Sequence, residues 1–266
     1  MAFLGSVRTN PEWVCLDRDR RYPRAMRVPR LLVIQHELDD HLNELAGPFV
    51  DAGLTIEPWF TYLKPSPLLD VSEYDGVVAL GAIVGVKNEA EHPWMFVERQ
   101  VLEKAVAEGT PTLGVCFGAQ LLASVGGGQV QRAGSPEIGW APVDMDAEAA
   151  DDPVLATLGS RPHVFQFHYD AFGEPESGVI LGRTGRLNQV VRIGDRAWGV
   201  QFHLEVNPGT IYSWIATYGD EMREQGADLD ALAAETAQHW QEYRRLARAF
   251  GDAFAAQVTA FAKRRL

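Results

Sequence analysis

Cysteine is scarce in this sequence, which has two cysteines, Cys15 and Cys116, among its 266 residues. The two lie in very different surroundings, so they do not form the disulfide framework of a small secreted domain. The N-terminus lacks the apolar segment of a secretory signal, and no run approaches the ~20 apolar residues that a membrane span needs. These absences lead us to expect a cytoplasmic protein without a membrane partner, in which Cys15 is an incidental thiol.

Positive charge is also in short supply, because 24 basic residues face 36 acidic ones and the formal net charge is −12. Binding to phosphates requires clustered Lys and Arg side chains, so we expect no nucleic-acid partner. One basic stretch runs from Arg18 to Arg30, with Asp17 and Asp19 beside or within it. We interpret residues 1–29 as a solvated N-terminal arm that lies over the main domain.

Nucleotide-binding patterns are missing as well. The sequence contains no G-x-x-x-x-G-K-[ST] segment. It also has no other glycine-rich loop after an expected strand that could bind a phosphate group. We therefore do not expect this chain to activate an acceptor with ATP by itself. No internal repeat or low-complexity linker divides it.

From about Arg30 the sequence alternates between strand-like and helix-like segments. Leu31–Gln35 is a continuous apolar run, which is typical of a strand buried on both faces of a parallel sheet. Strands are also expected at Leu54–Trp59, Tyr74–Leu80, Thr112–Val115, Trp140–Met145, Val164–Phe167, Val179–Gly182, Gln189–Ile193 and Ala197–Phe202, and helices at His41–Gly53, Pro93–Glu108 and Phe117–Val125. This order predicts an α/β domain over residues 30–220, with three α/β/α layers and an open, mainly parallel sheet.

Residues 221–266 have a different pattern, which we interpret as a C-terminal helical extension. From Asp228 to Phe261, apolar residues recur at three- and four-residue spacing, which predicts a long amphipathic helix or a helical pair broken near Gly251. The apolar stripe either folds back on the domain or forms a docking surface for a partner protein or a second copy of the chain.

The segment Gly114–Gly118 (GVCFG) is the cysteine version of the G-x-S-x-G nucleophile elbow. A buried strand brings Cys116 to the carboxyl edge of the sheet, where the sites of α/β proteins form. The tight turn leaves no room for flanking side chains, and the helix that follows favours a thiolate through its free N–H groups and dipole. The Phe117 N–H would then stabilise an oxyanion. The alternative is a buried cysteine whose glycine neighbours only permit close packing.

A candidate base follows in the segment Gly199–Val206 (GVQFHLEV). A thiolate that attacks amides needs a base that later protonates the leaving amine. His203 falls at the end of an apolar strand, and Glu205 comes two residues later, close enough to fix the tautomer and orientation of the imidazole.

Four motifs resemble, in the same order, those of the class I (triad-type) glutamine amidotransferases. The most similar group is the stand-alone proteins related to the glutaminase half of GMP synthase, in which a C-terminal helical tail is also seen. The motifs are Leu113–Leu122 (LGVCFGAQLL), Glu137–Trp140 (EIGW), Phe167–Asp170 (FHYD) and Gly199–Val206, and the resemblance spans roughly residues 31–215. It implies a flavodoxin-like amidotransferase fold.

The resemblance also implies roles for individual residues. Cys116 corresponds to the nucleophile, His203 to the base and acid, and Glu205 to the carboxylate that orients the imidazole. Gln120 is placed against the γ-glutamyl group. Leu204 stands where the wider family commonly has proline, a position that contributes no chemistry.

The second oxyanion donor of the family comes from the turn after Leu80, where the family usually reads Gly-Gly-Pro. This chain reads Gly81-Ala82-Ile83. An N–H at Ala82 can serve unless the turn requires a positive φ, which would strain an alanine.

His168 and Asp170 form a second H-x-D pair. A metal site would collect them with His203 and Glu205 as nitrogen and oxygen ligands, but a thiolate elbow leaves a metal no evident task. We therefore expect no metal and no cofactor. The resemblance instead places His168, Tyr169 and Asp170 in a loop that lines the substrate site.

Together these features predict hydrolysis of the γ-amide of glutamine through a γ-glutamyl thioester. The chain would then be a glutaminase that donates ammonia to a synthetase on a separate polypeptide. A first alternative is a stand-alone hydrolase of γ-glutamyl peptides or amides. A second is a catalytically silent binding or regulatory homologue, which only the altered turn at residues 81–83 supports.

Overall fold

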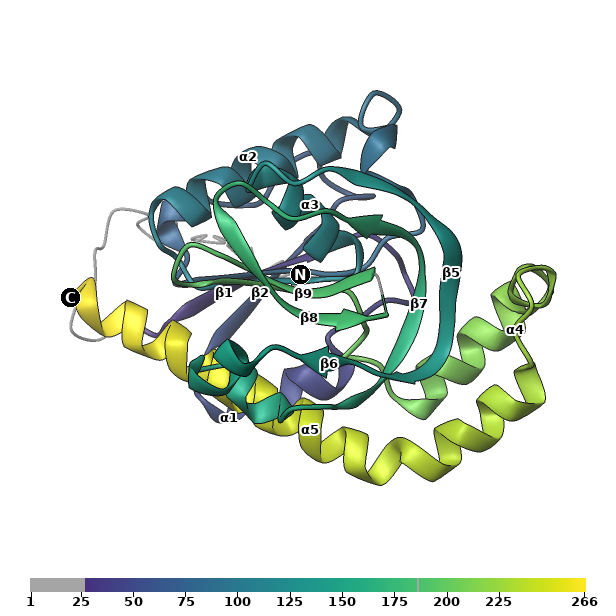
Figure 1. The fold of residues 1–266 in the computed structure, drawn as a ribbon. Helices are drawn as coiled ribbons and strands as arrows, with labels where there is room; N and C mark the ends of the chain where they lie inside the picture. The colour runs from purple at the N-terminus through teal and green to yellow at the C-terminus, as the bar shows by residue number, and fades with distance from the viewer. Residues whose placement is uncertain (1–26, 186) are drawn as a thin grey trace, which may run out of the picture.

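The computed structural model describes residues 27–185 and 187–266 (Figure 1). Cys15 and most of the predicted arm at 1–29 therefore lie outside the described residues. At the centre is an eight-stranded sheet in the order β2-β1-β3-β4-β10-β9-β8-β6. In that order its strands are Thr55–Phe60, Arg30–Gln35, Gly76–Ala79, Thr112–Val115, Ala197–Val200, Leu187–Ile193, Gly178–Thr184 and Asp144–Met145.

The strands from β2 to β10 pair in parallel, and β9, β8 and β6 extend the sheet by antiparallel pairing. β3, β4 and β10 are buried along their whole length, which is why their sequences are apolar runs rather than alternating patterns. The predicted α/β fold with an open, mainly parallel sheet is confirmed.

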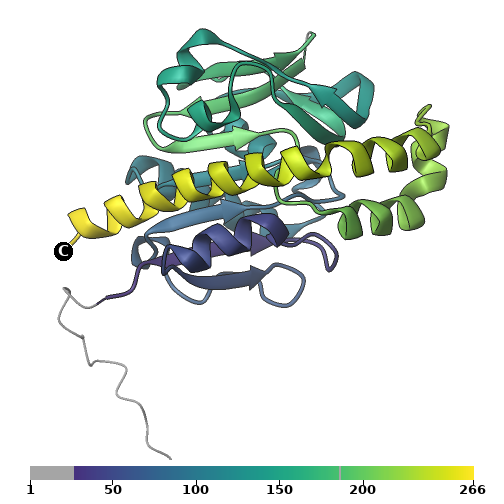
Figure 2. The same cartoon turned by 90° about the horizontal axis from the view of Figure 1, so that it is seen from below.

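Helices cover both faces of this sheet (Figure 2). Successive residues of β1 point to opposite faces, so Leu31 and Val33 join one apolar cluster and Leu32 and Ile34 the other. The first cluster also contains side chains of α1 and α5, and the second contains side chains of α2 and α3. The helices are α1 (Ala46–Asp51), α2 (Pro93–Ala107), α3 (Phe117–Val125), α4 (Pro208–Glu224) and α5 (Leu229–Arg264). Short 3-10 helices lie at Asn43–Leu45, Val71–Glu73, Val86–Asn88, Ala147–Asp151 and Leu155–Leu158.

A second, two-stranded sheet stands beside the first. β5 (Val130–Pro142) and β7 (His163–Phe172) pair antiparallel, with a register shift between Arg132 and Glu137. The strand expected at Val164–Phe167 is part of β7. The strand expected at Trp140–Met145 is divided between the end of β5 and the short strand β6 of the main sheet. The first half of β5 was not predicted, because its half-exposed residues lack an apolar alternation.

Two predicted helices differ in detail from the observed ones. Where a helix was expected over His41–Gly53, a 3-10 turn leads into the six-residue α1. Pro48 has no N–H to donate to residue 44, so a regular helix cannot extend back through this segment. In α2 the apolar side was expected to include Phe96, which is 54% exposed, whereas Glu98 is fully buried.

α5 is continuous and crosses the molecule on one face of the sheet (Figure 2). The sequence allowed a break near Gly251, but the glycine serves packing instead: a Cβ there would lie 2.7 Å from Pro48 Cγ. The apolar stripe of α5 is buried within the chain, with Tyr243, Phe250 and Phe254 at most 1% exposed. Full burial of such side chains contributes about 1.5–3 kcal/mol each.

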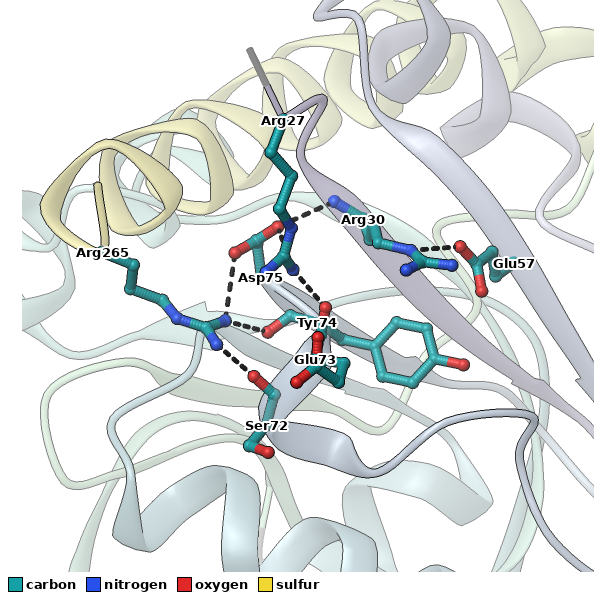
Figure 3. Close-up of polar contacts among 8 residues, drawn as sticks. All are labelled: Arg27, Arg30, Glu57, Ser72, Glu73, Tyr74, Asp75 and Arg265. Carbon is teal, nitrogen blue, oxygen red and sulfur yellow. Dashed lines mark hydrogen bonds and ion pairs between the residues drawn. The ribbon is translucent and has the colours of Figure 1, made fainter. Parts of the chain in front are cut away.

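Polar contacts hold the C-terminal end of α5 to the turn before β3 (Figure 3). The Arg265 guanidinium donates to the carbonyls of Tyr74 (2.6 Å) and Ser72 and to Asp75 Oδ1 (3.1 Å). Asp75, 2% exposed, also accepts from the Arg30 N–H (2.9 Å) and from Arg27 (3.1 Å). One buried carboxylate thus joins the start of β1, the start of β3 and the end of α5.

Within the described ranges, no helix combines the length and apolar character that crossing a bilayer requires.

Candidate active site

Cys116 forms a strained turn between β4 and α3. Its backbone has φ of 50° and ψ of −105°, a combination that residues with a Cβ rarely adopt. The Cys116 N–H donates to the Val200 carbonyl (2.9 Å), and the Cys116 carbonyl accepts from the Gln120 N–H (3.0 Å). The turn is therefore fixed by β10 on one side and α3 on the other. Cys116 itself is 6% exposed.

Both glycines of the elbow are required by close backbone packing. A Cβ on Gly114 would lie 2.5 Å from the Gly118 carbonyl oxygen, and a Cβ on Gly118 would collide with the Ala79 carbonyl. The Gly118 N–H also donates to the Leu80 carbonyl (3.1 Å). The two glycines let the first turn of α3 lie directly against β3 and β4. The helix can therefore begin at Phe117, immediately after Cys116. This is the strand–turn–helix geometry that the G-x-C-x-G pattern predicts.

His203 and Glu205 form a buried ion pair next to the elbow. His203 Nδ1 lies 2.5 Å from Glu205 Oε1, and the two side chains are 4% and 0% exposed. Burial by itself would lower the pKa of His203, but the charges of Glu205 and Cys116 outweigh it and raise this pKa well above 6.5. The Trp214 ring packs against the imidazole in a T-shaped arrangement, with ring centroids 4.9 Å apart. The imidazole is therefore held in one orientation in its protonated form.

The sulfur of Cys116 and the outer nitrogen of His203 are neighbours without a hydrogen bond between them. Sγ lies 3.8 Å from the Phe167 carbonyl oxygen and 3.7 Å from Gln201 Nε2. Among the described residues, His203 Nε2 has no hydrogen-bond partner. The Cys116 charge contributes to the raised pKa of His203. Hydrogen bonds between reacting groups are often long or poorly aligned before substrate binds, so the lack of a direct hydrogen bond here is compatible with proton transfer.

The expected oxyanion donors lie on two elements. Phe117 is the first residue of α3, where N–H groups have no partner inside the helix. Gly81 and Ala82 follow β3. In the described ranges the non-glycine residues with positive φ are Asn43 and Cys116. Ala82 therefore has an ordinary backbone conformation, without the strain that its replacement of glycine suggested.

A second buried histidine–glutamate pair, which was not predicted from the sequence, holds the Gly81 loop. His36 Nε2 lies 2.9 Å from Glu98 Oε2, and His36 Nδ1 lies 2.8 Å from the Gly81 carbonyl oxygen. Burial would lower the pKa of His36, but the Glu98 charge and the bonds to Glu98 and Gly81 raise it above 6.5. A protonated imidazole donates from both nitrogens. His36 thus fixes the Gly81 carbonyl and, because the peptide is planar, the Ala82 N–H as well.

A cavity of about 220 Å³ opens beside Cys116. This volume is smaller than the sites of drug-sized ligands, so it fits an amino acid or a small amide. Nine of the ten predicted site residues line it, and the tenth, Glu205, lies behind His203. The nine are Gly81, Ala82, Cys116, Phe117, Gln120, His168, Tyr169, Asp170 and His203.

Two of the predicted substrate-binding side chains are engaged with the protein. Gln120 Nε2 donates to the Asp170 carbonyl (3.2 Å) and to Gln201 Oε1 (3.3 Å). His168 places Nδ1 3.0 Å from the Asp170 carbonyl oxygen and Nε2 2.9 Å from Glu137 Oε2. These contacts fix the end of β7 against α3 and β5. Gln120 and His168 therefore shape the wall of the cavity.

The cavity also contains residues that the sequence did not reveal as site residues. They include Glu37, Asp39, Asp40, Arg132, Trp214, Tyr218 and Glu221. The first three had a usable signal, because they form a run of acidic residues directly after the buried strand β1, at the edge where α/β sites form. The others come from β5 and α4, whose distance from the elbow depends on tertiary packing.

Asp40 is a buried carboxylate next to the His203–Glu205 pair. It is 3% exposed, and its Oδ1 has no hydrogen-bond partner among the described residues. Burial, followed by the charge of Glu205, raises the pKa of Asp40 to about 7. One ligand atom each of Asp40, His203 and Glu205 lies within 4.8 Å of the others. The metal set considered from the sequence does not assemble in the described ranges, because His168 faces Glu137 instead.

The main chain of His203 is in contact with α5. The Tyr243 hydroxyl donates to the His203 carbonyl. Tyr243 is 1% exposed and packs against Trp140 with ring centroids 4.9 Å apart. Trp140 Nε1 in turn donates to Thr236 Oγ1 (3.0 Å). The C-terminal helix therefore fixes the main chain of the residue expected to act as base.

Comparisons with known proteins agree on one family. Residues 53–215 match the family described as glutamine amidotransferase class-I. The crystal structure of a glutamine amidotransferase from Thermotoga maritima superposes with a TM-score of 0.77, at 27% identity over 86% of this chain and 99% of that one.

Two curated relatives carry more specific names. A GMP synthase (glutamine-hydrolyzing) subunit of Saccharolobus solfataricus is 30% identical over 147 residues, which are 53% of this chain and 72% of that protein. γ-Glutamyl-L-1-hydroxyisopropylamide hydrolase of a Pseudomonas species is 32% identical over 154 residues, which are 54% of this chain and 52% of that protein.

Proposed function

The chain belongs to the class-I glutamine amidotransferase family, and from that premise we propose that it is a cysteine hydrolase of γ-glutamyl amides. Cys116 is the nucleophile, His203 the acid and base, and Glu205 the group that orients His203. One observation carries the proposal: a strained cysteine at a helix N-terminus shares a small cavity with a buried imidazole–carboxylate pair.

In the first half-reaction the Cys116 thiolate attacks the γ-carbonyl carbon, and a C–S bond forms. The Phe117 and Ala82 N–H groups stabilise the negative charge on the carbonyl oxygen. The C–N bond then breaks, and protonated His203 donates its Nε2 proton to the departing amine. The products are a free amine, or ammonia if the substrate is glutamine, and a γ-glutamyl thioester on Cys116.

In the second half-reaction water replaces the amine. Neutral His203 takes one proton from the water, the hydroxide forms a C–O bond with the thioester carbonyl, and the C–S bond breaks. Glutamate leaves, its new carboxyl group releases a proton to solvent, and the thiolate–imidazolium pair is restored.

We favour the stand-alone hydrolase over the ammonia donor because of α5. Its apolar stripe was the candidate docking face for a synthetase, and this stripe is buried against the chain's own sheet layers. The relative that hydrolyses γ-glutamyl-L-1-hydroxyisopropylamide supports an amide substrate larger than glutamine. The relative from GMP synthase supports the ammonia-donor alternative.

The test is steady-state release of glutamate by the purified protein from glutamine and from γ-glutamyl amides. Cys116→Ala should abolish both activities, and Cys15→Ala, which removes the other thiol, should keep them. A glutamine-analogue electrophile should label the wild-type protein once, at Cys116. Residual glutamate release by Cys116→Ala would refute the mechanism. Turnover of glutamine without turnover of larger amides would favour the ammonia donor.

A further inference from the structure

The cavity carries more negative charge than a γ-glutamyl group can use. Five acidic side chains line it, Glu37, Asp39, Asp40, Asp170 and Glu221, against the guanidinium of Arg132 and the imidazolium of His203, which is already paired with Glu205. The glutamyl head of any substrate has one ammonium and one carboxylate and is neutral overall. It can pair its carboxylate with Arg132 and its ammonium with one acidic side chain, which leaves a negative surplus.

Most of these carboxylates have no cationic partner of their own. Asp170 lies 3.7 Å from Arg132, whose guanidinium also stacks over Tyr169 at 4.5 Å. Among the described residues, no Lys or Arg forms an ion pair with Glu37, Asp39 or Glu221. Their observed partners are neutral, such as the Ile83 N–H for Glu37 (3.3 Å).

Three of the acidic side chains line the cavity together with Tyr218. Asp39 accepts from the Tyr218 hydroxyl (3.5 Å). Burial, followed by the charges of Asp39, Glu37 and Glu221, raises the pKa of Tyr218, which places all three carboxylates near its hydroxyl. Tyr218 also contacts Phe167, with ring centroids 5.9 Å apart. Carboxylates combined with aromatic faces are the surroundings that a desolvated ammonium group prefers.

A second observation, inside the cavity, also favours a positively charged ligand. Asp40 lines the cavity and is only 3% exposed. Its buried Oδ1 has no hydrogen-bond partner among the described residues. An unpaired carboxylate oxygen in a buried site is costly unless something binds to it. A cationic group bound at this part of the wall would offset the charge of the Asp40 carboxylate.

We propose that the natural substrates are γ-glutamyl amides whose amine part carries a positive charge, such as a mono-γ-glutamyl diamine. This inference rests on the proposed hydrolase function. The γ-glutamyl carbonyl lies at Cys116, and the distal ammonium lies among Glu37, Asp39 and Glu221 beside Tyr218. Hydrolysis transfers OH from water to the acyl carbon and H to the amine, which releases glutamate and the free diamine.

The experiment compares three amides that share the γ-glutamyl head and a chain of similar length. They are the monoamide of 1,4-diaminobutane, which is cationic, the amide of pentylamine, which is neutral, and the amide of 4-aminobutanoate, which is anionic. We expect kcat/KM for the cationic amide to exceed that of the neutral one by about tenfold and that of the anionic one by more. High salt should reduce these ratios, because screening weakens exposed charge pairs.

Charge-removing variants then locate the preference. Glu37→Gln, Asp39→Asn and Glu221→Gln should each lower the cationic-to-neutral ratio by about threefold to tenfold. Glu224→Gln is the matched control, since Glu224 lies on the same helix as Glu221 but does not line the cavity. It should keep the ratio of the wild type. Circular dichroism verifies that each variant is folded.

The outcomes separate the inference from the function beneath it. Equal turnover of all three amides, or a preference for the anionic one, would overturn the inference and leave the hydrolase intact. Loss of the preference on addition of EDTA would overturn it too, because the carboxylates would then bind a metal ion. Failure to hydrolyse any γ-glutamyl compound, glutamine included, would overturn the proposed function itself.

Discussion

Two buried histidine–glutamate pairs lie on either side of the elbow, and their chemistry is nearly the same. His203 and Glu205 are 2.5 Å apart, His36 and Glu98 are 2.9 Å apart, and both imidazoles have a raised pKa. They differ in the second nitrogen of the ring. His36 uses it to bind the Gly81 carbonyl, whereas the buried Nε2 of His203, a residue that lines the cavity, is unpaired among the described residues.

In the proposed mechanism, this contrast separates an imidazole that transfers protons from one that holds a loop. Burial and a carboxylate partner alone do not distinguish them, since both pairs have them. A group that transfers protons must keep one nitrogen free for the substrate, and a group that holds a loop must have both nitrogens bonded. We therefore expect the two pairs to respond differently to the same kinds of substitution.

The largest difference should come from removing the imidazole of His203, the proposed base. His203→Asn deletes the free nitrogen, so neither the thiolate nor the departing amine has its proton partner. We expect kcat/KM to fall by about 10³-fold or more. Glutamate release measures the activity, and alkylation of Cys116 should slow as well. His239→Asn, on α5 outside the cavity, is the matched control. A loss smaller than tenfold would show that His203 is not the base.

Breaking the other pair should cost less activity and more stability. Glu98→Gln leaves His36 in place but removes its charge partner, so the Gly81 carbonyl and the Ala82 N–H lose their fixed orientation. We expect kcat to fall by about tenfold and the free energy of unfolding by about 3 kcal/mol. Urea denaturation and steady-state kinetics measure the two effects. An unchanged kcat would limit His36 and Glu98 to a structural role.

The same pair should make stability depend on pH. The folded-state pKa of His36 lies above its ordinary value of 6.5. Its contribution to stability is therefore fully present below about pH 6.5 and is lost as the pH rises through the raised pKa. The double variant His36→Gln/Glu98→Gln has no titrating group at this site. The difference in free energy of unfolding between wild type and double variant should shrink between about pH 6 and 9; a growing difference would contradict the assignment of His36 as a cation.

The smallest effect is expected at Tyr243, whose hydroxyl contacts the main chain of His203. Tyr243→Phe removes one hydrogen bond to the His203 carbonyl, and we expect a loss of about 1 kcal/mol in stability and a threefold lower kcat, roughly. Arg265→Gln at the other end of α5 is the control. It should lower stability through the loss of its contacts to residues 72–75 while kcat stays unchanged. If both variants lowered kcat equally, α5 would act only through global stability.

The two pairs also differ in how far they could be predicted. His203 and Glu205 are two residues apart after an apolar strand, and the elbow is contiguous, so local patterns sufficed to predict both. His36 and Glu98 are separated by 62 positions, and Glu98 looks like an ordinary polar residue of α2. Only the packing of α2 against β1 brings it to the imidazole.

The same distinction holds for the fold: elements with a local sequence pattern could be predicted, and elements placed by contacts between distant residues could not. Buried parallel strands have continuous apolar runs, so β1, β3 and β4 were found within a few residues of their bounds. α4 was missed, and β5 was found only in part, because their residues are half-exposed and their positions depend on contacts with α5 and β7. The acidic lining of the cavity depends on these contacts too, and it became visible only in three dimensions.

The contact between Tyr243 and His203 has a consequence for the order in which the site of a newly made chain assembles. The ribosome synthesises α5 after every other described element, so the elbow can fold while the backbone behind His203 still lacks its brace. The site gains this last support only when α5 packs against the sheet, because the hydrogen bond to the His203 carbonyl comes from Tyr243. We therefore expect the rest of the site to assemble first and the final, modest gain in order around His203 to follow α5.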